Sequence, residues 1–236
     1  MAKFARVIDT KSCMGCQSCV SACMVENHCT SGTLWNTMLE FESGKYPKTK
    51  KIFLTMGCMH CDKPACMAAC KKVGANAISK KEDGAVLIDY NKCIGCRECE
   101  AVCPYGVPRY NEEVTPLYPG TKGTEYESIS DKYRHSTHRK RANTAEKCTF
   151  CRHKIEQAEK DGKTDEIGDN PEYTPTCDVV CPVRARTFGD IDNPDSKVSK
   201  KLESKKAVQI KKEFGTGPQV HYLLEEGVEL ETYGRT

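Results

Sequence analysis

Sixteen of the 17 cysteines in this chain of 236 residues fall into four groups of four, and this grouping constrains the fold more than any other feature. Two groups share the spacing C-x2-C-x2-C-x3-C, and the others read C-x2-C-x4-C-x3-C and C-x2-C-x25-C-x3-C. In chain order the groups are Cys13, Cys16, Cys19 and Cys23; Cys58, Cys61, Cys66 and Cys70; Cys93, Cys96, Cys99 and Cys103; and Cys148, Cys151, Cys177 and Cys181. The chain must fold so that these thiols gather around shared centres.

The two regular runs indicate iron and sulfur. Three closely spaced thiolates bind one face of a [4Fe–4S] cube, and in two-cluster ferredoxins the fourth cysteine of each run binds the other cube. Gly15 and Gly95 lie between the first two cysteines of their runs, where positive φ angles and close backbone approach are needed. Zinc is the alternative, but its sites usually take two cysteines from each of two separated knuckles. We therefore predict four [4Fe–4S] clusters held by the sixteen cysteines, with exchange of ligands between paired runs.

Composition supports a fold that depends on these cofactors. Hydrophobic residues make up 38% of the chain, cysteine included, so the apolar core is thin. Because metal binding is coupled to folding in such domains, we expect iron-free protein to be largely unfolded. An odd cysteine count argues against a closed disulfide framework. The formal net charge is +3, and four clusters of about −2 each would bring it to about −5, which argues against nucleic-acid binding.

An internal repeat at an offset of 80 residues predicts the architecture. The segment Val7–Asp9 and the run that follows it match Leu87–Asp89 and the run starting at Cys93. Repetition at a fixed offset marks duplicated structural units. We predict an α+β fold of two ferredoxin-like dicluster units with short strands and helices, loop insertions and a C-terminal extension. The predicted divisions are 1–57 with 144–190, 58–110, an insertion at 111–143, and a helix and partner-docking tail at 191–236.

Local patterns predict several elements. We expect strands at 7–9 and 85–89, the latter paired with 77–79, and the start of a helix at 19–25. A helix is expected near 195–202, where Asp192, Asn193 and Pro194 provide a start signal, and a strand at 219–223. The polar segments 111–147 and 152–176 are interpreted as surface excursions or disordered spacers.

Residues near the cysteine runs allow simpler interpretations. Cys29 is predicted to be a buried free thiol, and His60 to pack or hydrogen-bond near the cluster rather than bind it, because four cysteines already suffice. Aromatic residues near the runs are expected to shield clusters from water; these are Trp35, Tyr90, Tyr105 and Tyr110. Lys11, Lys92 and Lys147 either raise cluster potentials or face solvent.

The chain resembles the four-cluster electron-transfer (beta) subunits of molybdopterin oxidoreductases of the dimethyl sulfoxide reductase superfamily. The segments that carry the resemblance are Ile8-Asp9, Cys58-Met59-His60-Cys61, Cys103-Pro104-Tyr105-Gly106, Lys147-Cys148-Thr149-Phe150-Cys151, Phe188-Gly189-Asp190 and Gly215-Thr216-Gly217-Pro218. Within that group it is most similar to the subunits of arsenate, polysulfide and tetrathionate reductases. The segment 196–199, together with the Gly-Thr-Gly-Pro tail, favours the arsenate type.

The resemblance implies how the ligands are shared between runs. The residues themselves indicate exchange within pairs but not which runs pair. The implied sets are Cys13, Cys16, Cys19 and Cys181 for cluster 1; Cys23, Cys148, Cys151 and Cys177 for cluster 2; Cys58, Cys61, Cys66 and Cys103 for cluster 3; and Cys70, Cys93, Cys96 and Cys99 for cluster 4.

The resulting hypothesis is an electron-transfer subunit without a catalytic site of its own. The resemblance implies a large catalytic partner carrying molybdopterin guanine dinucleotide, together with a quinol-reactive integral-membrane anchor or a cytochrome. Alternatives are a stand-alone polyferredoxin, the beta subunit of a non-respiratory molybdenum or tungsten enzyme, and a structural zinc or nucleic-acid-binding module.

The cellular location of the protein is predicted from a different set of sequence signals. The sequence shows no signal-peptide pattern, no twin arginine and no run of eighteen apolar residues. We therefore expect no membrane-spanning segment. The resemblance favours a periplasmic location, with export in the folded state on a partner's twin-arginine signal, and the alternative is the cytoplasm.

Overall fold

The computed structural model describes residues 2–29, 32–113, 142–204 and 207–224. In chain order its elements are β1 (Phe4–Asp9), α1 (Ser18–Glu26), β2 (Asn36–Lys45), β3 (Lys48–Gly57), α2 (Ala65–Lys72), β4 (Ile78–Lys80), β5 (Val86–Ile88), α3 (Glu98–Ala101), β6 (Arg109–Asn111), β7 (Thr144–Glu146), α5 (Arg152–Asp161), η3 (Thr164–Glu166), α6 (Thr176–Val179), β8 (Arg186–Asp190), α7 (Lys197–Ser204), β9 (Ala207–Val208), η4 (Lys212–Phe214) and β10 (Val220–Leu223). Short helices and small sheets alternate, so the predicted α+β class is confirmed. Within the described ranges, every helix is too short or too polar to cross a lipid bilayer.

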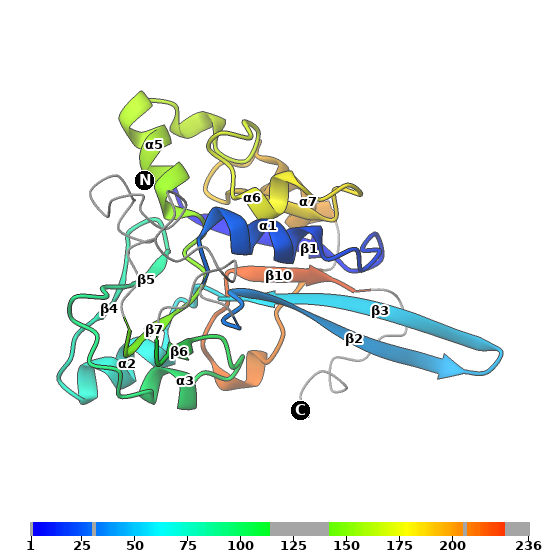
Figure 1. Ribbon diagram of the computed structural model, residues 1–236. Coiled ribbons are helices and arrows are strands. Elements are labelled where there is room, and N and C mark those ends of the chain that lie inside the picture. Colours follow the sequence, from blue (N-terminus) through cyan, green and yellow to red (C-terminus); the bar gives the residue numbers. More distant parts are fainter. Residues whose placement is uncertain (1, 30–31, 114–141, 205–206, 225–236) are drawn as a thin grey trace, which may run out of the picture.

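A four-stranded sheet joins the two ends of the described chain (Figure 1). Its order is β8-β1-β10-β9, with β1 parallel to β10 and antiparallel to β8. All six residues of β1 are buried. Ala5 and Val7 pack against Val198 of α7, whereas Phe4 and Ile8 belong to the main core with Phe188. The first strand is therefore covered on both faces, which explains its continuous burial.

The two regular cysteine runs have the same backbone course, as the repeat predicts. Gly15 and Gly95 have φ angles of 72° and 69°, and Gln17 and Arg97 have φ angles of 59° and 65°. Gln17 directly precedes helix α1 and Arg97 directly precedes helix α3. Each of these helices carries the third cysteine of its run. The offset of 80 thus repeats a loop conformation as well as a sequence pattern.

The other predicted elements are also present. The strands expected at 77–79 and 85–89 pair as β4 and β5 in an antiparallel ladder, with Ile78 opposite Ile88. The expected helix near 195–202 is α7, and the expected strand at 219–223 is β10. The insertion predicted at 111–143 is described only at 111–113 and 142–143, and the tail from residue 225 lies outside the described residues.

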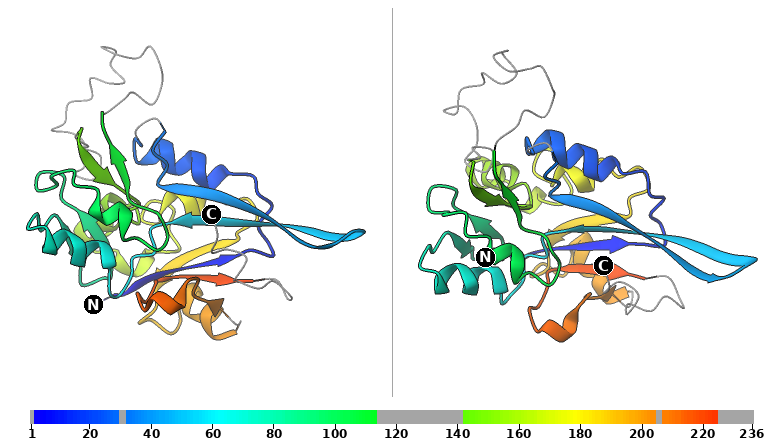
Figure 2. Two further views of the ribbon diagram at one scale, coloured as in Figure 1. Left: turned by 90° about the horizontal axis from the view of Figure 1, so that it is seen from below. Right: turned by 60° about the horizontal axis from the view of Figure 1, so that its bottom comes forward.

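A long hairpin, β2–β3, was not predicted. It consists of two ten-residue strands and extends well beyond the body of the protein (Figures 1 and 2). Its base packs on the first cysteine loop, because a Cβ added to Gly15 would lie 2.5 Å from the Phe53 ring. The hairpin therefore supports the loop that carries Cys13 and Cys16.

The segment 152–176 is only partly a surface excursion. Residues 152–161 form α5, and its Ile155 and Ala158 are buried in the main core. The correction has a physical reason: these two residues are three positions apart, so they lie on one face of a helix. The rest of the segment, 162–175, is a turn-rich connection that contains η3, as its composition indicates.

Candidate iron–sulfur centres

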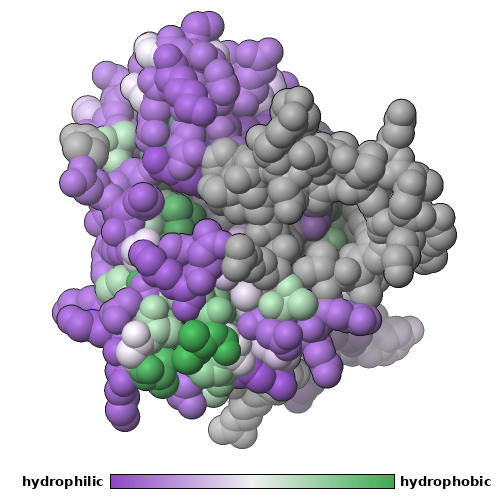
Figure 3. All heavy atoms as spheres, turned by 60° about the vertical axis from the view of Figure 1, so that its left-hand side comes forward, coloured by the Kyte–Doolittle hydropathy of each residue, from purple (hydrophilic) through white to green (hydrophobic). Residues whose placement is uncertain are grey.

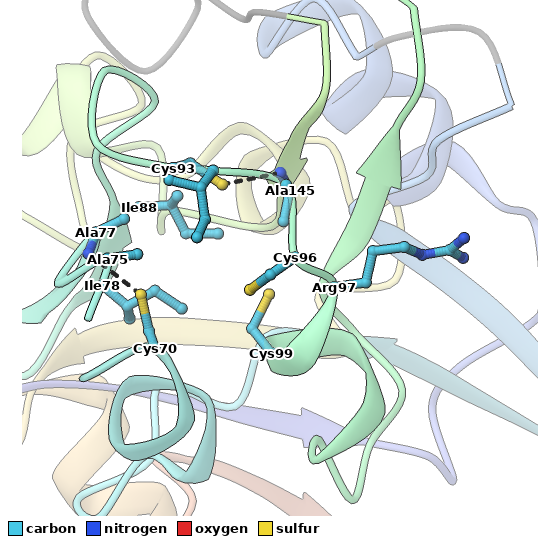
Figure 4. A pocket seen from close by; sticks show the side chains of 12 residues that line it. Cys70, Ala75, Ala77, Ile78, Ile88, Cys93, Cys96, Arg97, Cys99 and Ala145 are labelled. Atoms are coloured by element: carbon cyan, nitrogen blue, oxygen red, sulfur yellow. Dashed lines mark hydrogen bonds between the residues drawn. The ribbon is translucent and has the colours of Figure 1, made fainter. Parts of the chain in front are cut away.

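Four cysteines, one from the second run and three from the third, line one pocket. They are Cys70 on α2, Cys93 and Cys96 in the loop before α3, and Cys99 on α3. Figure 4 shows their sulfur atoms facing a shared space, with Arg97 pointing away from it. The remaining wall is apolar and is provided by Ala75, Ala77, Ile78, Ile88, Ile94 and Ala145. The arrangement can hold a compact inorganic group shielded from water.

Backbone amides point at the sulfur atoms of this cavity. The N–H of Ala77 donates to Cys70 Sγ at 3.2 Å, and the N–H of Ala145 donates to Cys93 Sγ at 3.5 Å (Figure 4). Hydrogen bonds to cluster sulfurs stabilise their negative charge and tune the reduction potential. The β6–β7 hairpin, which supplies Ala145, is thus part of the site although it contains no cysteine.

A matching cavity lies at the first cysteine run. It is lined by Cys13, Cys16 and Cys19 together with Cys181, which is 162 positions further along the chain than Cys19. The N–H of Ala185 donates to Cys181 Sγ at 3.3 Å. Cys181 therefore lies with the first three cysteines of the first run, and Cys23 is not among the residues that line this pocket.

Cys23, the last cysteine of the first run, lies near three cysteines of the fourth run, which are Cys148, Cys151 and Cys177. Asn27 Nδ2 lies 3.5 Å from Cys23 Sγ and 3.8 Å from Cys151 Sγ. Burial, followed by the charges of Cys177, Cys23 and Cys148, raises the pKa of the Cys151 thiol. All four of these cysteines are buried.

The remaining four cysteines are Cys58, Cys61, Cys66 and Cys103. Burial and then the Cys58 charge raise the pKa of Cys61 to about 11 and that of Cys66 to about 12, and Cys103 contributes to both shifts. The N–H of His60 donates to Cys58 Sγ at 3.4 Å. Each of the sixteen predicted cysteines is therefore placed next to other members of its predicted set.

The raised pKa values of these thiols indicate that the sites need a cationic group. Burial and neighbouring thiolates raise the pKa of Cys99 to about 11, and burial above all raises that of Cys177 to about 12. Buried thiolates cannot remain together without a cationic partner, since each disfavours ionisation of the others. A polynuclear iron–sulfur core supplies that charge and takes thiolate ligands. The residues present fit the [4Fe–4S] group that the cysteine spacing indicates.

Two buried arginines, which sequence reasoning missed, contact the group containing Cys177. Arg6 Nη2 and Arg186 Nη2 lie 3.4 and 3.6 Å from Cys177 Sγ. Both guanidinium groups also donate to Asp178, Arg6 through Nη2 at 2.6 Å and Arg186 through Nε at 3.2 Å. The sequence signal for Arg6 is its position within the apolar strand Phe4–Ile8, where an unpaired charge would be costly.

The predicted accessory residues are placed as follows. His60 is fully buried, its Nδ1 accepts the N–H of Val86 at 3.0 Å, and its ring stacks on Phe150 at 3.6 Å between centroids. Its predicted packing role is confirmed, and burial lowers its pKa, which keeps the ring neutral. Cys29 is buried, as predicted, and its Sγ lies 3.7 Å from the carbonyl oxygen of Cys23. Trp35, Tyr90 and Tyr105 are buried, whereas Tyr110 is half-buried.

Comparisons with known proteins agree with this geometry. The 4Fe-4S dicluster domain family matches residues 49–118 and, through a second family of the same description, residues 85–157. A selenate reductase subunit of Mesobacillus selenatarsenatis is 36% identical over 223 residues, which cover 92% of this chain and 70% of the relative. The chain belongs to the family of iron–sulfur subunits of oxidoreductase complexes.

Two further members of the family differ in what their names describe. The arsenate respiratory reductase iron–sulfur subunit of Shewanella sp. is 32% identical over 247 residues, covering 96% of this chain and 98% of the relative. The menaquinone reductase iron–sulfur cluster-binding subunit of Nitratidesulfovibrio vulgaris is 35% identical over 239 residues, covering 94% and 88%. The family thus serves several partner enzymes with one iron–sulfur subunit design.

Proposed function

We propose that this iron–sulfur subunit relays single electrons through four [4Fe–4S] clusters between a catalytic subunit and a second redox partner. The observation that carries the proposal is the gathering of sixteen cysteines into four groups of four. The proposed ligand sets are Cys13, Cys16, Cys19 and Cys181; Cys23, Cys148, Cys151 and Cys177; Cys58, Cys61, Cys66 and Cys103; and Cys70, Cys93, Cys96 and Cys99. The bound clusters supply the electron-accepting chemistry, and the protein positions and insulates them.

The connections between sets support a serial order from cluster 1 to cluster 4. Helix α1 carries Cys19 and Cys23 and therefore joins sets 1 and 2. The charge of Cys58 acts on Cys148, which brings sets 2 and 3 together. Helix α2 begins at Ala65 and contains both Cys66 of set 3 and Cys70 of set 4. Each set is thus linked to the next by a short stretch of backbone or by direct proximity.

Solvent exposure supports the assignment of the two ends. Among all cysteines, Cys16 of set 1 and Cys96 of set 4 are the exposed ones. Each stands beside an exposed apolar residue at the equivalent position of the repeat, Met14 at 59% exposure and Ile94 at 63%. Apolar side chains next to an exposed ligand are what a docking redox partner would cover. The proposed relay therefore meets its partners at these two loops.

The surface around set 4 has the character of such a docking site. Figure 3 shows hydrophobic atoms gathered low on the face that comes forward from the left of Figure 1, where α2 and α3 lie. Besides Ile94, the exposed apolar residues of this part are Val73, which follows α2, and Val102, which follows α3.

The relatives support a respiratory reductase of oxyanions or sulfur compounds as the partner enzyme. Their names include selenate, arsenate and tetrathionate reductases. We propose a molybdopterin catalytic subunit of this type and a quinol-linked membrane anchor or soluble carrier as the second partner. Because no acid–base or nucleophilic chemistry is required of an electron relay, we propose that the iron–sulfur subunit has no catalytic site.

The test is anaerobic purification with the native partner. We expect about 16 iron and 16 sulfide per chain and four reducible [4Fe–4S] centres by electron paramagnetic resonance. C93S should remove the signal of one centre and leave the other three. Colourless protein with stoichiometric zinc, or loss of two centres in C93S, would contradict the ligand sets. Reduction of arsenate, selenate and tetrathionate by the purified complex then identifies the partner's substrate.

A further inference from the structure

A buried lysine lies between the two inner cysteine sets. Lys147 is 2% exposed and precedes Cys148 of set 2. The charges that act most strongly on its ammonium group are those of Cys58 and Cys66 of set 3 and of Cys148. The charge of Lys147 therefore acts on both inner sets, whereas neither terminal set is among its main electrostatic partners.

Two backbone carbonyl groups hold the Nζ of Lys147. It donates to the carbonyl oxygen of Val86 and, at 3.2 Å, to that of Cys148. The N–H of Val86 donates to His60 Nδ1, and the N–H of His60 donates to Cys58 Sγ. The lysine side chain, which carries donors and no acceptor, is therefore held between Cys148 of set 2 and the segment that carries Cys58 of set 3.

We propose that Lys147 raises the reduction potentials of the two inner clusters and so keeps them accessible to electrons. The inference rests on the proposed ligand sets. Each cluster gains a negative charge on reduction, and burial together with adjacent clusters disfavours that charge. Without a nearby cation, the inner pair would be harder to reduce than the outer pair and would impede transfer between the ends. A positive charge in a poorly solvated site opposes this strongly.

The buried arginines do not replace this charge. Arg6 and Arg186 both contact Cys177, so they act on set 2 and, through Arg186, on Cys19 of set 1. They also share the carboxylate of Asp178, which offsets one of their two charges.

The chain provides a matched control. Lys92 precedes Cys93 as Lys147 precedes Cys148, but its side chain is 64% exposed and lies 3.5 Å from Asp89. Water and the Asp89 carboxylate screen its charge from cluster 4. Two lysines in the same sequence position therefore differ in predicted effect, a large shift for buried Lys147 and none for exposed, ion-paired Lys92.

The experiment is a potentiometric titration of the four clusters, followed by electron paramagnetic resonance, in wild type, K147M, K147Q, K147R and K92M. C61S and C151S assign the signals of clusters 3 and 2. In K147M and K147Q we expect the reduction equilibrium of these two clusters to fall at least about tenfold, which is about 59 mV for a one-electron couple. K147R should restore most of both shifts, and K92M should match wild type.

Several results would overturn the proposal. They are unchanged potentials in K147M, an equal shift in K92M, or a shift confined to the outer clusters. If neither K147M nor K147Q retains four clusters, Lys147 acts in assembly, and the proposal is wrong whatever K147R does. The iron and sulfide content of wild type tests the ligand sets separately, so the two failures are distinguishable.

Discussion

The buried network around Asp178 makes a quantitative prediction about cluster retention. The Asp178 side chain is 3% exposed and accepts hydrogen bonds from Arg6 and Arg186, whose side chains are each 4% exposed. D178N preserves the shape but removes the only carboxylate that these two guanidinium groups share in the described structure. Two buried cations would then face an amide whose N–H2 group cannot accept.

Removing one partner of a buried ion pair costs about 3–5 kcal/mol. The cost here should be near the lower end, because Cys177 Sγ remains within 3.4 Å of Arg6 and 3.6 Å of Arg186. A loss of about 3 kcal/mol increases the open population more than about a hundredfold. If clusters are lost from the open form, their loss in urea should accelerate by the same factor.

The assay is the anaerobic decay of the visible cluster absorbance in urea, compared between wild type, D178N and D169N. Asp169 pairs with Lys197, but both side chains are more than 60% exposed, at 62% and 68%. An exposed pair contributes at most about 1 kcal/mol, so D169N should change the rate less than about sixfold. Equal rates in D178N and D169N would refute the argument from burial. The cluster bound by Cys177 should also become easier to reduce in D178N.

Three further predictions follow from the cysteine loops and the central sheet. G95A should prevent loading of cluster 4, because the added Cβ would lie 2.3 Å from the backbone oxygen of Asn143. G74A is the control: Gly74 also has a positive φ angle but has open space around it, so this variant should load all its clusters. The iron content of the purified variants distinguishes the two outcomes. Burial lowers the pKa of His221 from 6.5, so the unfolded chain binds a proton more readily and stability falls as pH drops below about 6.5; urea unfolding should show this slope in wild type, and H221N should reduce it, with the buried His60 contributing the remainder. Anaerobic removal of iron should abolish most of the far-ultraviolet circular dichroism, and a native-like spectrum would contradict the dependence of folding on clusters.

The ligand positions could be predicted from sequence because their information is local. Runs such as that from Cys93 to Cys103 fix the loop and the helix that follows it within eleven residues. The pairing of runs is long-range, and it required either the resemblance or the structure. Cys181 joins Cys19 in space only because β8 pairs with β1.

Other features of the fold and site could not be predicted from the sequence, because they depend on long-range contacts. Lys92 and Lys147 have the same neighbour in sequence, yet one is exposed and the other is 2% exposed, because β5 closes over the second. Arg6 is stabilised by Asp178, which lies 172 positions away. The β2–β3 hairpin has an alternating pattern along its strands, but the two cysteine runs on either side of it are far more conspicuous. Sequence therefore predicted the candidate ligands, and tertiary contacts decided the electrostatics around them.

The position of β1 has a consequence for biosynthesis. This strand is synthesised long before its partners β8 and β10, which begin at Arg186 and Val220. At about 5–20 residues per second, β1 waits roughly 10–40 s for its first neighbour. The proposed ligands of cluster 4 span only Cys70 to Cys99, so they are synthesised together. The proposed sets of clusters 1 and 2 need Cys181 and Cys177, so they are complete only about 80 residues later, and maturation of the proposed relay proceeds from one end to the other.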